Sequence, residues 1–118
     1  MTYKGGWLVE AKAITRYVRL SPRKARLVAD LVRGKSALEA LDILEFTNKK
    51  AARFIKKTLA SAIANASNNF SMNEEKLVIS SIMINEGPDL KRVSPRAMGR
   101  ADIIRKPTAH IIVAVSEM

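Results

Sequence analysis

The sequence predicts a chain of the α+β class. Alternation of apolar and polar residues occurs at residues 11–20 and 77–86, and residues 111–115 form a β-branched run, so all three segments are predicted to be strands. Apolar residues recur at helical spacing in three segments between residues 21 and 67, which are predicted to be helices. A strongly basic stretch, residues 87–106, separates the last two strands and predicts a long hairpin.

The composition predicts a single domain. The chain has 118 residues, of which 47% are hydrophobic, and this suits one modest core. Within it we expect a leader at residues 1–10, where two adjacent glycines favour an open conformation. Residues 11–86 and 107–118 are expected to form a globular body, and residues 87–106 an extended hairpin arm.

The first helix has clear boundaries in the sequence. Ser21 is predicted to be its N-cap and Pro22 its first residue, because a hydroxyl satisfies free N–H groups and proline has no N–H to lose. Gly34 is predicted to end the helix. The side expected to face the core consists of Ala25, Leu27, Val28, Ala29, Leu31 and Val32. The other side is expected to carry Arg23, Arg26 and Arg33, with Asp30 among them.

Two further helices follow. Ser36 and Glu39 have the spacing of a capping box and predict a short acidic helix through Leu44. Asn48 is predicted to cap a long helix that runs to about Ser67 and ends at the two following asparagines. Its apolar side consists of Ala51, Ala52, Ile55, Leu59, Ala62, Ile63 and Ala66. Its opposite side carries Lys49, Lys50, Arg53, Lys56 and Lys57. Two interpretations of this basic side stay open, a solvated helix face and a contact with an RNA backbone.

The sequence offers no chemistry for catalysis or for metal binding. Cysteine is absent, and His110 is the single histidine, so we predict for it a structural role or one hydrogen bond. Met83 is predicted to lie in the core of its strand. Nucleophile motifs, phosphate-binding glycine loops and metal-spaced clusters do not occur, and no apolar run approaches the length of a membrane span. We therefore expect no catalytic residue, no metal, no cofactor and no membrane partner.

The hairpin arm carries the most informative charge pattern. Residues 91–106 contain six basic side chains and one acid, Asp102. A two-stranded hairpin is marginally stable in water, and the repulsion between like charges weakens this one further. A surrounding polyanion would stabilise it, and the net charge of +10 is typical of nucleic-acid binders. The arm residues predicted to bind RNA are Lys91, Arg92, Arg96, Arg100, Arg105 and Lys106. A solvated loop kept soluble by its charge is the simpler alternative.

A second group of cations surrounds the start of the first helix. Free N–H groups at a helix N-terminus attract phosphate, and basic side chains nearby add to that attraction. The body residues predicted to bind RNA are Arg16, Arg19, Arg23, Lys24 and Arg26. The few aromatic residues are dispersed, which favours recognition of shape and phosphates over the stacking of bases on a sheet face.

Several stretches of the chain together match one known family. The matching stretches are Ser21–Lys24, Arg26–Gly34, Ala40–Leu44, Thr47–Ala52, Ser61–Ala66, Asn85–Pro88, Leu90–Arg92, Pro95–Ala97 and Gly99–Ala101. The match covers about residues 11–118, and the segment from Glu86-Gly87-Pro88 to Gly99-Arg100-Ala101 is its most specific part. On these stretches the chain closely resembles the bacterial large-subunit ribosomal protein twenty-two family.

The resemblance implies an α+β fold in which three helices pack on a small antiparallel sheet, with a long protruding basic β-hairpin. It implies a structural constituent of the large ribosomal subunit, without enzymatic activity, that binds ribosomal RNA and supports subunit assembly. The hairpin tip would line the nascent-peptide exit tunnel. Lys91, Arg92, Arg96 and Arg100 would then contact RNA or face the tunnel, and Arg105 and Lys106 would bind RNA further down the arm.

The implied partners are the large-subunit ribosomal RNA, neighbouring large-subunit proteins and the nascent peptide. No small-molecule substrate is implied, although macrolide antibiotics bind nearby in the family. The expected location is the ribosome in the cytoplasm, and an organellar ribosome stays open. Two other functional classes also stay open. One is a free regulatory nucleic-acid binder or RNA chaperone, which would bind duplex DNA and be found apart from ribosomes. The other is an RNA-modifying enzyme or nuclease, which would turn over RNA.

Overall fold

The computed structural model describes residues 10–88, 90–95 and 101–117, with residues 90–95 and 101–106 described by their backbone. A three-stranded antiparallel sheet forms the centre of the body and has the order β1-β5-β2. Its strands are β1 (Glu10–Val18), β2 (Leu77–Glu86) and β5 (Ala109–Glu117). The helices are α1 (Pro22–Val32), α2 (Ala37–Phe46) and α3 (Lys50–Phe70), and a 3₁₀ turn, η1 (Glu74–Lys76), precedes β2.

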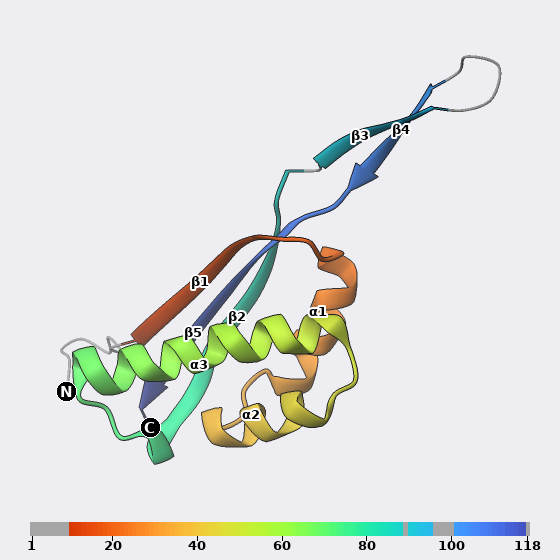
Figure 1. Cartoon of the computed structure of the whole chain (residues 1–118). Coiled ribbons are helices and arrows are strands. Elements are labelled where there is room, and N and C mark those ends of the chain that lie inside the picture. The colour runs from red at the N-terminus through yellow and green to blue at the C-terminus, as the bar shows by residue number, and fades with distance from the viewer. Residues whose placement is uncertain (1–9, 89, 96–100, 118) are drawn as a thin grey trace.

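All three helices lie on one side of the sheet, and α3 runs along it (Figure 1). Two polar contacts fix α3 on β1: the hydroxyls of Thr15 and Thr58 are 2.7 Å apart, and the amide of Asn65 donates to the Lys12 carbonyl at 2.9 Å. This arrangement confirms the predicted α+β class with three helices on a small antiparallel sheet. The predicted leader, residues 1–10, lies outside the described residues except for Glu10.

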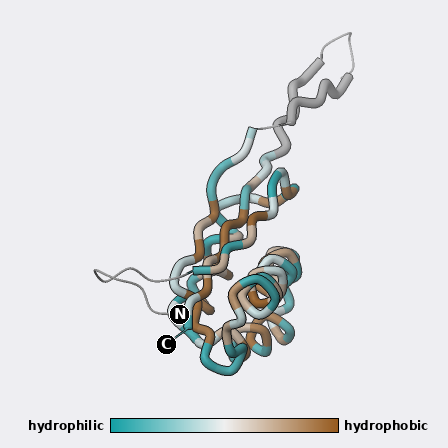
Figure 2. The backbone as a smooth tube through the Cα atoms, turned by 90° about the vertical axis from the view of Figure 1, so that its left-hand side faces the viewer, coloured by the Kyte–Doolittle hydropathy of each residue, from teal (hydrophilic) through white to brown (hydrophobic). Residues whose placement is uncertain are grey.

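The core lies between the sheet and the helices, where hydrophobic residues of both layers meet (Figure 2). The predicted apolar side of α3 is confirmed, because all seven of its residues are buried. From the sheet, the largest fully buried side chains are Leu77, Ile82, Ile111, Val113 and Val115. Alternate residues of each strand thus meet the helices, as expected for a sheet with one covered face.

A β-bulge in β2 keeps its apolar residues on the covered face. Ile79 pairs with Val115 and Ser81 with Ala114, so Ser80 is an extra residue. The bulge shifts the alternation by one position, and Ile79 and Ile82 both remain buried. The prediction that Met83 lies in the core is wrong, since its side chain is 47% exposed. Met83 lies between two inward-facing isoleucines and therefore points to the opposite face.

The structure corrects the predicted core side of α1. Ala25, Val28, Ala29 and Val32 are buried as expected, but Leu27 is 65% exposed and Leu31 49% exposed. Each residue turns the helix by about 100°. Leu27 and Leu31 each precede a buried valine, Val28 or Val32, by one residue. This rotation of about 100° places their side chains outside the buried stripe.

The helix ends agree with the sequence only in part. Ser21 occupies the N-cap of α1 as predicted, but its side chain makes no cap hydrogen bond. Ser36 does cap α2, because its Oγ accepts a hydrogen bond of 3.3 Å from the Glu39 N–H. Gly34 follows α1 with a φ of +78°, the left-handed conformation that suits glycine.

The limits predicted for the other two helices are wrong. The second helix runs past Leu44 to Phe46. The third has Lys49 at its N-cap in place of Asn48, and it continues through both asparagines to Phe70. It ends where Ser71 adopts the left-handed conformation, with a φ of 52°. The asparagines are tolerated because the buried face holds this long helix together, so tertiary packing overrides their weak helix propensity.

The predicted hairpin is present as a separate two-stranded antiparallel sheet. It consists of β3 (Leu90–Pro95) and β4 (Ala101–Lys106), which pair with each other and with no other strand of the described chain. Figure 1 shows this sheet projecting from the end of the body. The radius of gyration is 17.7 Å, against about 13–14 Å for a compact chain of this length.

The base of the arm is tightly packed. The Gly87 N–H donates to the Thr108 carbonyl at 2.9 Å, and the Thr108 hydroxyl donates to the Pro88 carbonyl at 2.6 Å. Thr108 is buried, and a β-carbon built on Gly87 would lie 2.4 Å from its Oγ1. Position 87 therefore requires glycine because of this close approach.

Candidate nucleic-acid interface

The strand register of the arm brings predicted RNA-binding residues together. Lys91 pairs directly with Arg105, and Lys106 pairs with Leu90 on the neighbouring rung. Arg92 pairs with Ile104 on the rung that follows on the other side. Like charges at directly opposite positions weaken an antiparallel pair. The arm therefore has a charge distribution that its own pairing does not favour. The predicted tip residues Arg96 and Arg100 lie outside the described residues.

A second β-bulge places cations beside the base of the arm. Thr15 pairs with Ile111 and Val18 with Ala109, so Arg16 and Tyr17 together lie opposite His110. Tyr17 has a φ of 56°, an uncommon backbone conformation for an aromatic residue. Arg16 is exposed on this bulge, and Arg19 is exposed just after the strand ends. Bulges of this kind change the direction in which side chains leave a strand.

His110 holds the bulge in place. Its Nδ1 accepts a hydrogen bond of 3.1 Å from the Tyr17 N–H. The two rings also meet edge to face, with their centroids 4.9 Å apart. The structural role predicted for this histidine is confirmed by these contacts.

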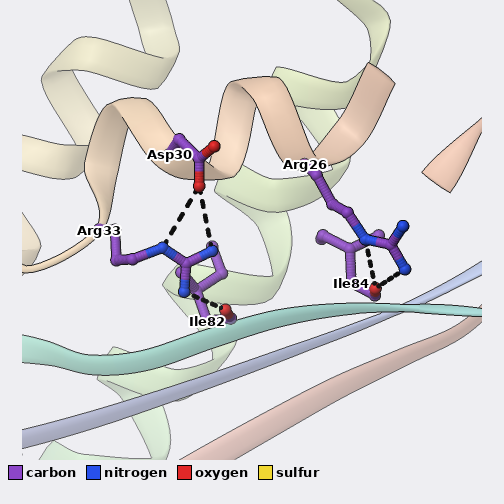
Figure 3. A network of polar contacts seen from close by, with 5 residues as sticks. All are labelled: Arg26, Asp30, Arg33, Ile82 and Ile84. Atoms are coloured by element: carbon purple, nitrogen blue, oxygen red, sulfur yellow. Dashed lines mark hydrogen bonds and ion pairs between the residues drawn. The ribbon is translucent and has the colours of Figure 1, made fainter. Parts of the chain in front are cut away.

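Two arginines, Arg26 in α1 and Arg33 at its C-cap, point toward β2, where they donate to the carbonyls of Ile84 and Ile82 (Figure 3). The distances are 3.1 and 2.9 Å from Nε and Nη2 of Arg26, and 2.8 Å from Nη1 of Arg33. Arg33 also pairs with Asp30 at 3.2 Å. β2 is an edge strand, so its outward carbonyls have no neighbouring strand to bond with. The two arginines satisfy two of these carbonyls, which could otherwise pair with a strand of another chain.

Arg26 was predicted as an RNA contact, and the structure assigns two of its five N–H donors to the Ile84 carbonyl. It remains exposed, as do Arg23 and Lys24 one turn earlier. The ion pairs in the described part of the chain are Arg33–Asp30 and Lys56–Glu45. None of the five predicted body cations belongs to either pair. Their charge is therefore not neutralised by the described residues of this chain.

Surface hollows connect these cations with the basic side of α3. One hollow of about 410 Å³ is bordered by Arg19, Ser21, Lys50 and Pro107, so it joins the start of α1, the start of α3 and the base of the arm. A second, of about 450 Å³, lies between α1 and α3 and is bordered by Lys24 and again by Lys50. A third, of about 460 Å³, adds Arg53 and Lys57. Lys50 borders all three hollows.

The α3 cations were not among the predicted RNA-binding residues, because a helix face exposed only to solvent also carries many charged residues. The sequence does contain a signal. Lys49, Lys50 and Arg53 lie at the N-terminal end of a helix with no acid in its first turn. The helix dipole is positive there, so cations destabilise that end. Three of them at this end indicate a role other than helix stability.

The described residues contain no group of three His, Asp or Glu side chains that could hold a metal ion. In the same residues, no helix is long and apolar enough to cross a bilayer. The described residues do carry a basic patch next to the base of the basic arm, and we define this patch as Arg16, Arg19, Arg23, Lys24, Lys49, Lys50, Arg53 and Lys57.

Comparison with known proteins agrees with the sequence resemblance. The family model for ribosomal protein L22p/L17e matches residues 13–116. The large ribosomal subunit protein uL22 of Fusobacterium nucleatum is 85% identical over 109 residues, which cover 92% of this chain and 98% of that protein. The uL22 protein of Thermus thermophilus is 60% identical over 109 residues, with 92% and 96% covered. That of Petrotoga mobilis is 57% identical over 110 residues, with 93% and 74% covered. The chain therefore belongs to the ribosomal protein L22p/L17e family.

Proposed function

We propose that this protein is a structural, non-enzymatic constituent of the large ribosomal subunit, which binds ribosomal RNA and supports subunit assembly. The arm would insert between RNA segments, and its tip would line the nascent-peptide exit tunnel. The partners would be ribosomal RNA, neighbouring large-subunit proteins and the nascent peptide. The ribosome of the cytoplasm would be its location.

One observation carries the proposal. The arm is a two-stranded sheet in which Lys91 lies directly opposite Arg105. Such a sheet gains little stability from its own pairing and loses some through repulsion. If a polyanion binds the arm, the attraction between its phosphates and these cations would outweigh the repulsion, and the charges would then stabilise the sheet. The names of the relatives, all of them large ribosomal subunit proteins, identify ribosomal RNA as the polyanion to test.

The basic patch supports the same function from the body. It adjoins the arm base through the hollow that Lys50 and Pro107 share. An RNA that binds the arm can therefore continue onto the body without crossing an acidic surface at that point. Contacts from both regions would fix the orientation of the protein, because phosphate contacts position a protein on nucleic acid.

Sedimentation tests the location. A tagged protein should comigrate with the large subunit in a sucrose gradient of cell lysate, and it should stay there at moderate salt. Protein that remains at the top of the gradient, or that mild salt removes, would indicate the alternative of a free regulatory RNA binder or RNA chaperone.

Salt dependence of binding tests the mechanism. If the six arm cations each neutralise one phosphate, the arm alone contributes a log–log salt slope of about −4 to −5. Replacing Arg92, Arg96 and Arg100 by alanine should flatten the slope by about 2–3 and weaken binding to large-subunit ribosomal RNA in a filter assay. The melting temperature should not change, because these residues lie in the arm and not in the core of the body. Unchanged affinity and slope would refute the proposed role of the arm.

A further inference from the structure

Phe46 is the most exposed large hydrophobic residue of the described chain. It is the last residue of α2, and 86% of its surface is accessible. The helix is anchored by other residues, Ala37, Ala40 and Leu44, which are buried. Phe46 therefore contributes little to the fold, and its ring is accessible to a ligand.

The ring borders a hollow of about 400 Å³, which is within the size range of small-ligand sites. Besides Phe46, the polar and charged residues around it are Glu45, Thr47, Asn48, Lys49, Arg53 and Lys56. Three cations and one acid give this hollow a net charge of +2. It thus combines one aromatic face, one amide side chain and an excess of positive charge.

The backbone that carries this hollow is fixed by hydrogen bonds. The Thr47 hydroxyl donates to the Ile43 carbonyl at 2.7 Å, and the Thr47 N–H donates to the Leu44 carbonyl at 3.3 Å. The Lys49 N–H then donates to the Thr47 carbonyl at 2.9 Å. These bonds close the turn between α2 and α3 (Figure 1), so the positions of Phe46 and Lys49 are set before any ligand arrives.

The single acid of the hollow is already neutralised. Glu45 forms an ion pair with Lys56, which also ties the end of α2 to α3. Lys49 and Arg53 are both exposed and belong to neither ion pair of the described residues. Two cations beside an exposed aromatic ring are the components of a single-strand nucleic-acid site, in which a base stacks and its phosphates are neutralised.

We infer that this hollow binds one unstacked nucleotide of RNA, with its base on the Phe46 ring and its phosphates at Lys49 and Arg53. The inference rests on the proposed RNA-binding function and adds a site that reads an unpaired nucleotide. It also qualifies the expectation from the dispersed aromatics, because it needs one ring and no aromatic sheet face. An apolar protein segment would cover Phe46 equally well, but it would leave the charges of Lys49 and Arg53 without partners.

Equilibrium binding to the large-subunit ribosomal RNA of Fusobacterium nucleatum, transcribed in vitro, tests this site. Phe46→Ala should weaken binding by about 5- to 150-fold, the fold-change expected for one stacked base, without changing the salt slope. Phe46→Tyr retains a stacking ring and should bind as the unmodified protein does. Phe70→Ala is the matched control, since Phe70 is also exposed and lies at the other end of α3. Melting curves of all variants should show that the fold is intact.

A second measurement detects stacking directly. In a Trp7→Phe background, Phe46→Trp provides a single tryptophan whose fluorescence should be quenched when this RNA binds. Absence of quenching, together with unchanged affinity of Phe46→Ala, would overturn the inference. A blue shift that appears only in assembled subunits, and not with RNA, would show burial against a protein and would overturn it as well. If instead the unmodified protein fails to bind the RNA, the proposed function itself fails.

Discussion

Replacing Gly87 by alanine should destabilise the joint between the body and the arm. The added β-carbon would lie 2.4 Å from Oγ1 of Thr108, and 3.2 Å from Cε1 of His110. Thr108 cannot easily move away, because it is 2% exposed and its hydroxyl is bonded to the Pro88 carbonyl. Rotation of its side chain would break that bond, and one of the two other rotamers would place the methyl group where the oxygen was. Relief of the clash therefore requires either the loss of this hydrogen bond or a movement of the backbone.

The expected cost follows from this geometry. Overpacking of a closely packed site costs about 1–3 kcal/mol. For a chain of this length, that lowers the melting temperature by roughly 3–5 °C per kcal/mol. Thermal and urea unfolding followed by circular dichroism would measure both quantities. Gly34→Ala provides a comparison in which the strain arises from a φ of +78° and not from a contact, since nothing lies within 4 Å of its added β-carbon.

A double-mutant cycle isolates the contact. Thr108→Ala alone should cost about 1–2 kcal/mol, for one hydrogen bond and one buried methyl group. Combined with Gly87→Ala it removes the atom that clashes, so the double variant should be more stable than the sum of the two losses predicts, by about 1 kcal/mol or more. Additive losses, or a Gly87→Ala variant with the original melting temperature, would refute the argument.

Three further predictions concern the body and are all checked by unfolding measurements. Ser36→Ala should cost about 1 kcal/mol because Ser36 caps α2, whereas Ser21→Ala should change stability by less than about 0.5 kcal/mol because Ser21 makes no cap bond; equal losses would show that both serines act as caps. Val32→Ala should cost about 2–3 kcal/mol, and Leu27→Ala less than about 0.5, since Val32 is fully buried and Leu27 is 65% exposed; a large loss at Leu27 would mean that its side chain packs in the core. Arg26→Ala should cost about 1 kcal/mol in the absence of RNA, since Arg26 bonds the Ile84 carbonyl; an unchanged stability would indicate a role in ligand binding alone.

The sequence predicts the class of this fold because its periodic patterns are strong. The strand Leu77–Glu86 has the predicted limits, and the buried side of α3 contains all the predicted residues, with Thr58 in addition. The same patterns do not indicate a bulge, because one extra residue such as Ser80 leaves the composition of a strand unchanged. Met83 was misplaced for this reason. The helix ends were predicted less well, because packing along α3 extends that helix through residues that usually end one.

The candidate site was predicted in part. The register of β3 and β4 brings Lys91 and Arg105 together, which a basic hairpin in the sequence already suggests. The basic patch required the structure, since Arg19 and Lys50 border one hollow although they are far apart in the chain. Phe46 also required it. An aromatic residue at the end of an amphipathic helix is typical of a core residue, and its exposure becomes evident only when the packing of α2 is known.

The cations of this protein differ in whether they bond to acceptors of the chain itself or remain available to a ligand. A cation that stabilises the protein itself donates to an acceptor of the chain, as Arg26 and Arg33 do at the edge of β2. The two ion pairs of the described residues involve Arg33 again and one further cation, Lys56. These contacts leave the net charge of +10 unchanged, because an ion pair uses one acid for each cation and a carbonyl carries no charge. Unpaired cations lie in the basic patch and basic residues recur in the arm, where repulsion opposes folding and a bound polyanion would relieve it. Binding should therefore raise the stability of the arm more than that of the body, and added salt should reduce that difference.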